Sequence, residues 1–128
     1  MHLGIMEIFD PEKPYDLDKR IRAFVLEIFE FVEGLPNNSA GRNVRNQLVR
    51  CASSVGSNYR AARRGRSNKE YIAKLGICEE EGDESCYWLE LCIDAKWNVE
   101  KKAEPLLKEA NEITAIIVYL IKKAKGRL

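Results

Sequence analysis

Apolar residues recur at intervals of three and four along four stretches of the chain, which is the spacing of one face of an α-helix. These stretches predict helices at about residues 16–34, 39–65, 67–98 and 105–125. Because the connections are short, neighbouring helices should run antiparallel, so we expect an all-α, up-down-up-down antiparallel four-helix bundle over residues 16–125. The positions expected to face its core are Leu17, Ile21, Phe24, Val25, Ile28, Val32, Leu35, Val44, Leu48, Cys51, Val55, Tyr59, Ala62, Tyr71, Leu75, Cys78, Gly82, Ser85, Leu89, Cys92, Leu106, Leu107, Ala110, Ile113, Ile117, Leu120, Ile121 and Ala124.

Capping signals mark the starts of the second and third helices. Asn38 or Ser39 can cap the second. The third begins with Ser67, and Glu70 follows three residues later, which is the spacing of a capping box. The segment just before Ser67 is therefore expected to be a tight joint between two antiparallel helices.

The two ends of the chain carry weaker signals. Pro105 stands where the first residue of the fourth helix is expected. Residues 1–15 precede the helical pattern and should form an extended or disordered lead-in. Three lysines at the end of the fourth helix suit the negative end of its dipole, namely Lys122, Lys123 and Lys125.

The composition narrows the class of protein. The chain has 128 residues, of which 45% are hydrophobic and 32% charged, and this suits one globular domain. A net charge of +1 argues against binding driven by overall charge. No apolar run approaches the roughly 20 residues of a membrane span, and no signal-peptide pattern is visible. We therefore expect no membrane partner.

Candidate chemistry is sparse. The cysteines form no C-x-x-C pair and lie in predicted helices, which favours free buried thiols and a cytoplasmic location; they are Cys51, Cys78, Cys86 and Cys92. His2 is the only histidine, so a nucleophile has no histidine base. There is no glycine-rich phosphate loop and no metal-ligand spacing. The sequence thus predicts no catalytic residue, cofactor or metal, and a protein that is not an enzyme.

Charge is strongly segregated between the second and third helices. From Gly34 through Lys69 there is no acidic residue. On a helical wheel the arginines of the second helix share an arc of about 140° opposite its apolar face. The third helix carries the acidic run Glu79-Glu80-Glu81-Gly82-Asp83-Glu84, and its outward carboxylates share an arc of about 120°.

Three interpretations of these faces remain open. They can be solvated surfaces with weak pairs. They can form a heterologous interface between copies, with small residues allowing close approach; its candidate residues are Arg42, Arg45, Arg50, Ser53, Gly56, Ser57, Glu80, Asp83, Glu84 and Glu90. The arginines can instead bind nucleic-acid phosphates; the candidates are Arg60, Arg63, Arg64, Arg66 and Lys69. Three aromatic residues, Tyr87, Trp88 and Trp97, could stack on bases. Because they stand at helical spacing beside the apolar stripe, we interpret them instead as anchors in the core or in an interface.

The segment from Gln47 to Leu91 carries a resemblance to a known family. It contains Q-L-x-R, then S-S-V-x-x-N, then a small hinge with a serine, and finally Y-W-L-E-L. These features resemble the bacterial four-helix-bundle proteins that are encoded in intervening sequences of large-subunit ribosomal RNA genes. The resemblance covers roughly Tyr15 to Lys125. It departs from some relatives at Ala61 or Ala62, where they carry a glutamate, and this makes the present segment more basic.

The resemblance implies a four-helix bundle that assembles as a pentameric ring. It also implies kinship with the accessory proteins of diversity-generating retroelements, which bind nucleic acid and a reverse transcriptase through a basic surface. We therefore expect a cytoplasmic, non-enzymatic homo-oligomer that acts as a scaffold or accessory protein. Its expected partners are copies of itself, RNA or DNA, and a reverse transcriptase or another protein. The alternative is a protein-interaction module with no nucleic-acid role.

Overall fold

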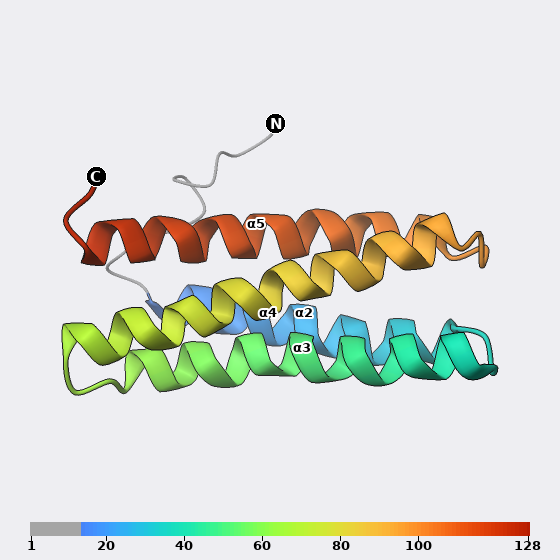
Figure 1. Cartoon of the computed structure of the whole chain (residues 1–128), viewed down its shortest axis with the longest axis horizontal. Helices are drawn as coiled ribbons and strands as arrows, with labels where there is room; N and C mark the ends of the chain where they lie inside the picture. Colours follow the sequence, from blue (N-terminus) through green and yellow to red (C-terminus); the bar gives the residue numbers. More distant parts are fainter. Residues whose placement is uncertain (1–13) are drawn as a thin grey trace.

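The computed structural model describes residues 14–128, and within them the chain forms four long antiparallel helices and no strand. These are α2 (Pro14–Phe31), α3 (Ser39–Arg63), α4 (Asn68–Asp94) and α5 (Glu100–Ala124), with a single 3-10 turn, η1 (Val32–Gly34), after α2. The helices run up, down, up and down beside one another (Figure 1). The predicted all-α, four-helix antiparallel bundle is confirmed.

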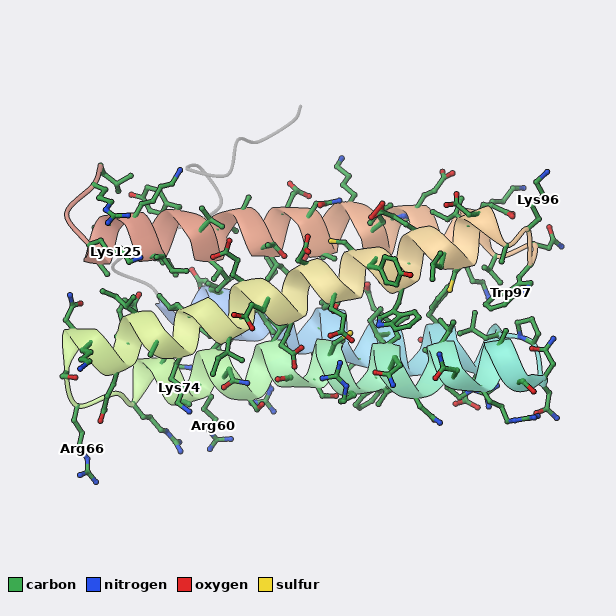
Figure 2. The ribbon with its side chains drawn as sticks, viewed as in Figure 1. Arg60, Arg66, Lys74, Lys96, Trp97 and Lys125 are labelled. Atoms are coloured by element: carbon green, nitrogen blue, oxygen red, sulfur yellow. The ribbon has the colours of Figure 1, made fainter. Side chains whose placement is uncertain are left out.

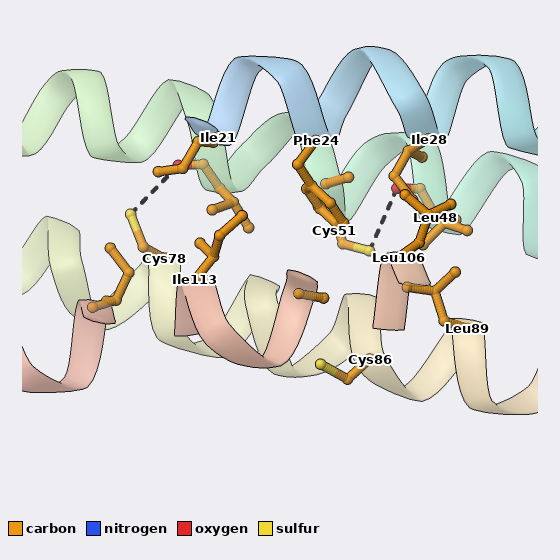
Figure 3. Packing of buried hydrophobic residues seen from close by; sticks show 14 of the residues in the cluster. Ile21, Phe24, Ile28, Leu48, Cys51, Cys78, Cys86, Leu89, Leu106 and Ile113 are labelled. Atoms are coloured by element: carbon orange, nitrogen blue, oxygen red, sulfur yellow. Dashed lines mark hydrogen bonds between the residues drawn. The ribbon is translucent and has the colours of Figure 1, made fainter. Parts of the chain in front are cut away.

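One continuous core fills the space between the helices. Ile21, Phe24 and Ile28 of α2 meet residues of the other three helices there (Figure 3). The apolar positions predicted from the sequence are buried, except for five that are only partly covered: Val25, Tyr71, Leu107, Ile121 and Ala124. The apolar pattern missed other buried positions, among them Phe31, Ala103 and Ile116. Ala52 is buried beside the predicted stripes, and Cys86 is buried as expected for its thiol.

An ion pair closes the bundle between its first and last helices. The guanidinium of Arg20 on α2 donates to both carboxylate oxygens of Glu109 on α5, at 2.8 and 2.7 Å. Glu112, one turn further along α5, lies 3.6 Å from the same guanidinium. A planar two-point pair of this kind fixes the axial register of α2 against α5 as well as their proximity.

The ends of the helices differ from the sequence-based boundaries. α4 ends at Asp94 instead of residue 98, because Lys96 and Asn98 adopt left-handed backbone with φ of 57° and 64°. α5 begins at Glu100, so the prediction that Pro105 starts this helix is wrong. Proline removes one hydrogen bond near the start of a helix, whereas the extra turn buries the side chain of Ala103 completely.

The first helix also differs. α2 begins at Pro14, which occupies the first helical position that suits proline, so the predicted lead-in is too long at its end. Residues 1–13 of that lead-in, including His2, lie outside the described residues. The α-helix ends at Phe31, and η1 carries the chain as far as Gly34.

Side-chain caps hold the starts of α3 and α4. Asn38 caps α3 by accepting the Gly41 N–H at 2.8 Å. The Ser67 hydroxyl oxygen accepts the Glu70 N–H at 3.1 Å. The Glu70 carboxylate accepts the Arg66 N–H at 2.7 Å, one residue earlier than in the usual capping box. The predicted joint between the second and third helices is therefore present with its serine cap.

The Ser67→Ala variant should lose about 1 kcal/mol of folding free energy, because one N–H of the first turn of α4 loses its side-chain acceptor. Urea denaturation at fixed protein concentration measures the loss. Ser39→Ala is the matched control, since Asn38 and not Ser39 caps α3, and it should stay within about 0.5 kcal/mol of the unmodified protein. An unchanged urea midpoint for Ser67→Ala would contradict a structural role for this cap.

Candidate nucleic-acid and subunit interfaces

The arginines of α3 do not form one uniform surface, because tertiary contacts engage some of them within the chain. Arg45 donates to the backbone carbonyls of Val32 and Leu35, at 3.2 and 3.4 Å, and so holds the end of η1. Arg42 donates to the side-chain oxygen of Asn37 at 3.3 Å. These two candidate interface residues support the connection between α2 and α3.

Arg50 pairs with α4 of its own chain. Its guanidinium lies 3.0 Å from the Glu81 carboxylate and also donates to Glu84. The Glu84 carboxylate accepts the indole N–H of Trp88 at 3.0 Å, and these bonds from Trp88 and Arg50 lower the pKa of Glu84. Both Arg50 and Glu84 were candidates for an interface between copies, but their charges are already matched inside one copy.

Arg63 is also engaged inside the bundle. Its guanidinium lies 3.3 Å from the Asp18 carboxylate on α2 and 5.9 Å from the ring centre of Tyr59. Both charged side chains are largely covered. Arg63 therefore joins α3 to α2 and is a weaker phosphate candidate than its neighbours.

The remaining nucleic-acid candidates are available to a partner. Within residues 14–128, no ion pair involves Arg60, Arg64, Arg66 or Lys69, and all four are exposed. Arg60 and Arg66 point away from the bundle (Figure 2). A recess of about 720 Å³ lies between the end of α3 and the start of α4. Arg64 is part of its lining.

The fold adds cations from α5 to the same end of the molecule. The C-terminus of α5 lies beside the joint between α3 and α4 (Figure 1), and the Asn68 side chain donates to the Ala124 carbonyl at 3.0 Å. Figure 2 shows Lys125 and Arg66 at this end. We call the exposed cations here the basic end; they are Arg64, Arg66, Lys69, Lys122, Lys123, Lys125 and Arg127.

Sequence reasoning assigned the α5 lysines only to the helix dipole. The signal that could have placed them is topological: in an up-down-up-down bundle, the end of the fourth helix lies beside the joint between the second and third. Charge that is distant along the chain therefore accumulates at one end, although the net charge is only +1.

The other interface candidates lie on two separate surfaces. Ser53, Gly56 and Ser57 line a groove of about 370 Å³ between α2 and α3. A stripe on the exposed side of α4 contains Tyr87 and four acidic residues that form no ion pair within residues 14–128: Glu80, Asp83, Glu90 and Asp94.

The cysteines are buried and reduced in the structure, and burial raises the pKa of each thiol. No group of three or more histidine, cysteine or acidic side chains within residues 14–128 is arranged to hold a metal ion. No helix of that range is long and apolar enough to cross a membrane.

Comparisons with known proteins agree with this architecture. The family model described as 23S rRNA-intervening sequence protein matches residues 14–119. A crystal structure from Bacteroides thetaiotaomicron, described as a protein with unknown function from the S23 ribosomal protein family, is 27% identical with a TM-score of 0.76. The similarity covers 83% of this chain and 98% of that one. None of the curated proteins is a significant match.

Proposed function

Because this chain belongs to the family of 23S rRNA-intervening sequence proteins, we propose that it is a non-enzymatic bundle that assembles with copies of itself and binds the phosphates of structured RNA or DNA. The basic end is the observation that carries the nucleic-acid part of this proposal. Its cations come from two separate segments, residues 64–69 and residues 122–127, and none forms an ion pair within residues 14–128.

The chemistry of the basic end favours the nucleic-acid backbone over the bases. Arginine and lysine contact phosphates without reading sequence. Tyr59 and Tyr71 line the recess beside Arg64, and Tyr119 stands one turn before Lys122 on α5. Tyr59 is buried and the other two are half-buried, so none of the three offers a fully exposed ring on which bases could stack. Binding should therefore be tolerant of sequence and should weaken steeply with salt as counterions are released.

The assembly part of the proposal is supported by opposite charges on α3 and α4 and by apolar side chains left exposed on α2 and α4. Five copies is the number that the family resemblance implies. In a ring the basic end of every copy would repeat around one rim, so that modest single contacts add through avidity.

We expect a mobility-shift titration at about 50 mM salt to detect binding to duplex RNA or DNA. The Lys122→Ala/Lys123→Ala and Arg64→Ala/Arg66→Ala variants should each lower the affinity roughly tenfold across unrelated sequences. For duplex DNA, the slope of log affinity against log salt should become shallower by about 0.9 for every phosphate that a variant no longer neutralises.

Lys101→Ala/Lys102→Ala is the matched control, because it removes two adjacent exposed lysines from the opposite end of the same helix. It should leave the affinity unchanged. If the control and the basic-end variants bind equally well, the nucleic acid uses another surface. If the unmodified protein produces no shift, the protein-interaction module without a nucleic-acid role is the better description.

A further inference from the structure

We propose that the acidic stripe of α4 in one copy docks into the groove between α2 and α3 of a second copy, with Tyr87 seated in that groove. This inference rests on the self-assembly part of the proposed function and names the two surfaces that would carry it. The acidic stripe consists of Glu80, Asp83, Tyr87, Glu90 and Asp94. The groove is lined by Asp18, Arg22, Val25, Leu26, Phe29, Ser53, Gly56, Ser57 and Arg60.

The groove combines an apolar wall with a floor of small residues. Leu26 and Phe29 on α2 are 64% and 42% exposed, although each is large and apolar. On the α3 side, Ser53, Gly56 and Ser57 leave room for a side chain of a partner. Exposed apolar surface beside small residues is typical of a site where another helix packs closely.

The rim of the groove is positively charged. Arg22 and Arg60 both line it, are exposed, and form no ion pair within residues 14–128. Asp18, the one carboxylate of the lining, lies 3.3 Å from the guanidinium of Arg63 and is neutralised there. The groove therefore presents an apolar centre flanked by uncompensated cations.

The acidic stripe has the complementary character. Its residues follow one another at spacings of three and four, so they lie on one side of α4, and all are exposed. Tyr87 stands between the acidic pairs and is 53% exposed. Its ring packs edge-on against Trp88, with ring centres 5.1 Å apart, and Trp88 is anchored by its bond to Glu84. This backing reduces the entropy lost when Tyr87 docks.

The groove and the acidic stripe complement each other between two copies and not within one copy. Within one chain α2 and α4 are not neighbouring helices of the bundle, and the acidic stripe lies on the exposed side of α4, so it faces away from the groove of its own chain. The two surfaces share no residue, and each copy can therefore use its groove and its acidic stripe at once. Such a heterologous contact closes into a ring or continues as a filament.

Two single substitutions test this inference by light scattering of the full chain. Leu26→Asp places a negative charge in the groove, and Tyr87→Asp removes the central aromatic ring of the acidic stripe. Each variant alone should have the mass of a monomer at concentrations where the unmodified protein is an oligomer, with association at least about tenfold weaker, as expected for a central contact. Ser57→Trp, which fills the groove without adding charge, should act like Leu26→Asp.

An equimolar mixture of Leu26→Asp and Tyr87→Asp is the decisive sample. Each retains one intact surface, so the mixture should form a 1:1 dimer and nothing larger. Ile77→Asp is the control, since Ile77 is an exposed apolar residue of α4 outside both surfaces; it should keep the mass of the unmodified protein. Circular dichroism confirms that each variant is folded.

The possible failures are distinguishable. If the unmodified protein is a monomer, both self-assembly and this docking are wrong. If it is an oligomer and Leu26→Asp, Ser57→Trp and Tyr87→Asp all keep its mass, the copies assemble through other surfaces and only the docking is overturned. A mixture that stays monomeric also overturns it, because the groove and the acidic stripe would then not bind each other.

Discussion

The Gly41→Ala variant should lose about 3 kcal/mol of folding free energy, near the upper end for an overpacked site. Gly41 is buried in the first turn of α3, where the helix crosses the incoming chain. A Cβ at this position would lie 1.9 Å from the Pro36 carbonyl oxygen and 2.8 Å from its carbonyl carbon. Both are backbone atoms, so no rotation of a side chain can relieve the clash.

The surroundings of Pro36 also resist movement. Asn38 accepts the Gly41 N–H, and Arg45 donates to the carbonyls of Val32 and Leu35 on the other side of Pro36. A shift of this connection would break these bonds. The added methyl group should therefore either strain the start of α3 or unfold its first turn.

Gly76→Ala is the matched control for this prediction. Gly76 lies inside α4, and a Cβ there would have no neighbour within 4 Å. Alanine in an exposed helix interior is more stable than glycine by about 0.5–1 kcal/mol, so this variant should be stabilised. Urea denaturation at fixed protein concentration compares the two. Equal midpoints for Gly41→Ala and the unmodified protein would mean that the connection before α3 moves freely.

The folded protein should resist thiol reagents at all four cysteines near pH 8. Burial raises the pKa of Cys78 to about 12, and that of Cys86 and Cys92 to about 11. Since the thiolate is the reactive form, this raised pKa makes the thiolate of Cys78 far scarcer near pH 8 than in an unfolded chain. Labelling should become fast only in denaturant, and mass spectrometry counts the labels. Rapid labelling of one cysteine in the folded protein would contradict this prediction and would show that the helix carrying this cysteine unfolds locally.

The same pKa shifts predict the response to alkaline pH. Each folded thiol holds its proton more tightly than the unfolded thiol, whose ordinary pKa is near 9. Their contribution to stability is therefore complete below about pH 9 and is lost as the pH rises towards 12. The Cys78→Ala variant should lose less stability over this range, although it loses some packing at every pH. An alkaline transition that this substitution leaves unchanged would assign the effect to other groups, such as Tyr59, whose pKa burial also raises.

The sequence alone determined the fold class and most of the core. The spacing of residues such as Leu17, Ile21 and Ile28 predicts which side of a helix is buried, because a helix of 3.6 residues per turn must place them together. Caps are equally local: Ser67 and Glu70 are close in the chain, and their bonds form within one turn. Local geometry is sufficient for such features, so they could be derived without knowing how the helices pack.

Boundaries that depend on packing could not be derived in this way. Pro105 is a local signal for the start of a helix, but the burial of Ala103 in the core favours a start at Glu100. The end of α4 at Asp94 depends on left-handed backbone at Lys96 and Asn98, which the sequence pattern does not predict. The free energy of core burial exceeds the preference of a single residue at such ends.

Only the tertiary structure decided what each charged residue does. The helical wheel placed Arg50, Arg60 and Arg63 on one face, yet Arg50 pairs with α4, Arg63 pairs with α2, and Arg60 has no ion pair within residues 14–128. A wheel reports direction about one helix axis, whereas an ion pair requires two side chains from different helices within a few ångströms of each other. That distance is set by the crossing and register of the helices, and the same packing brings the lysines of α5 beside the arginines of the joint between α3 and α4.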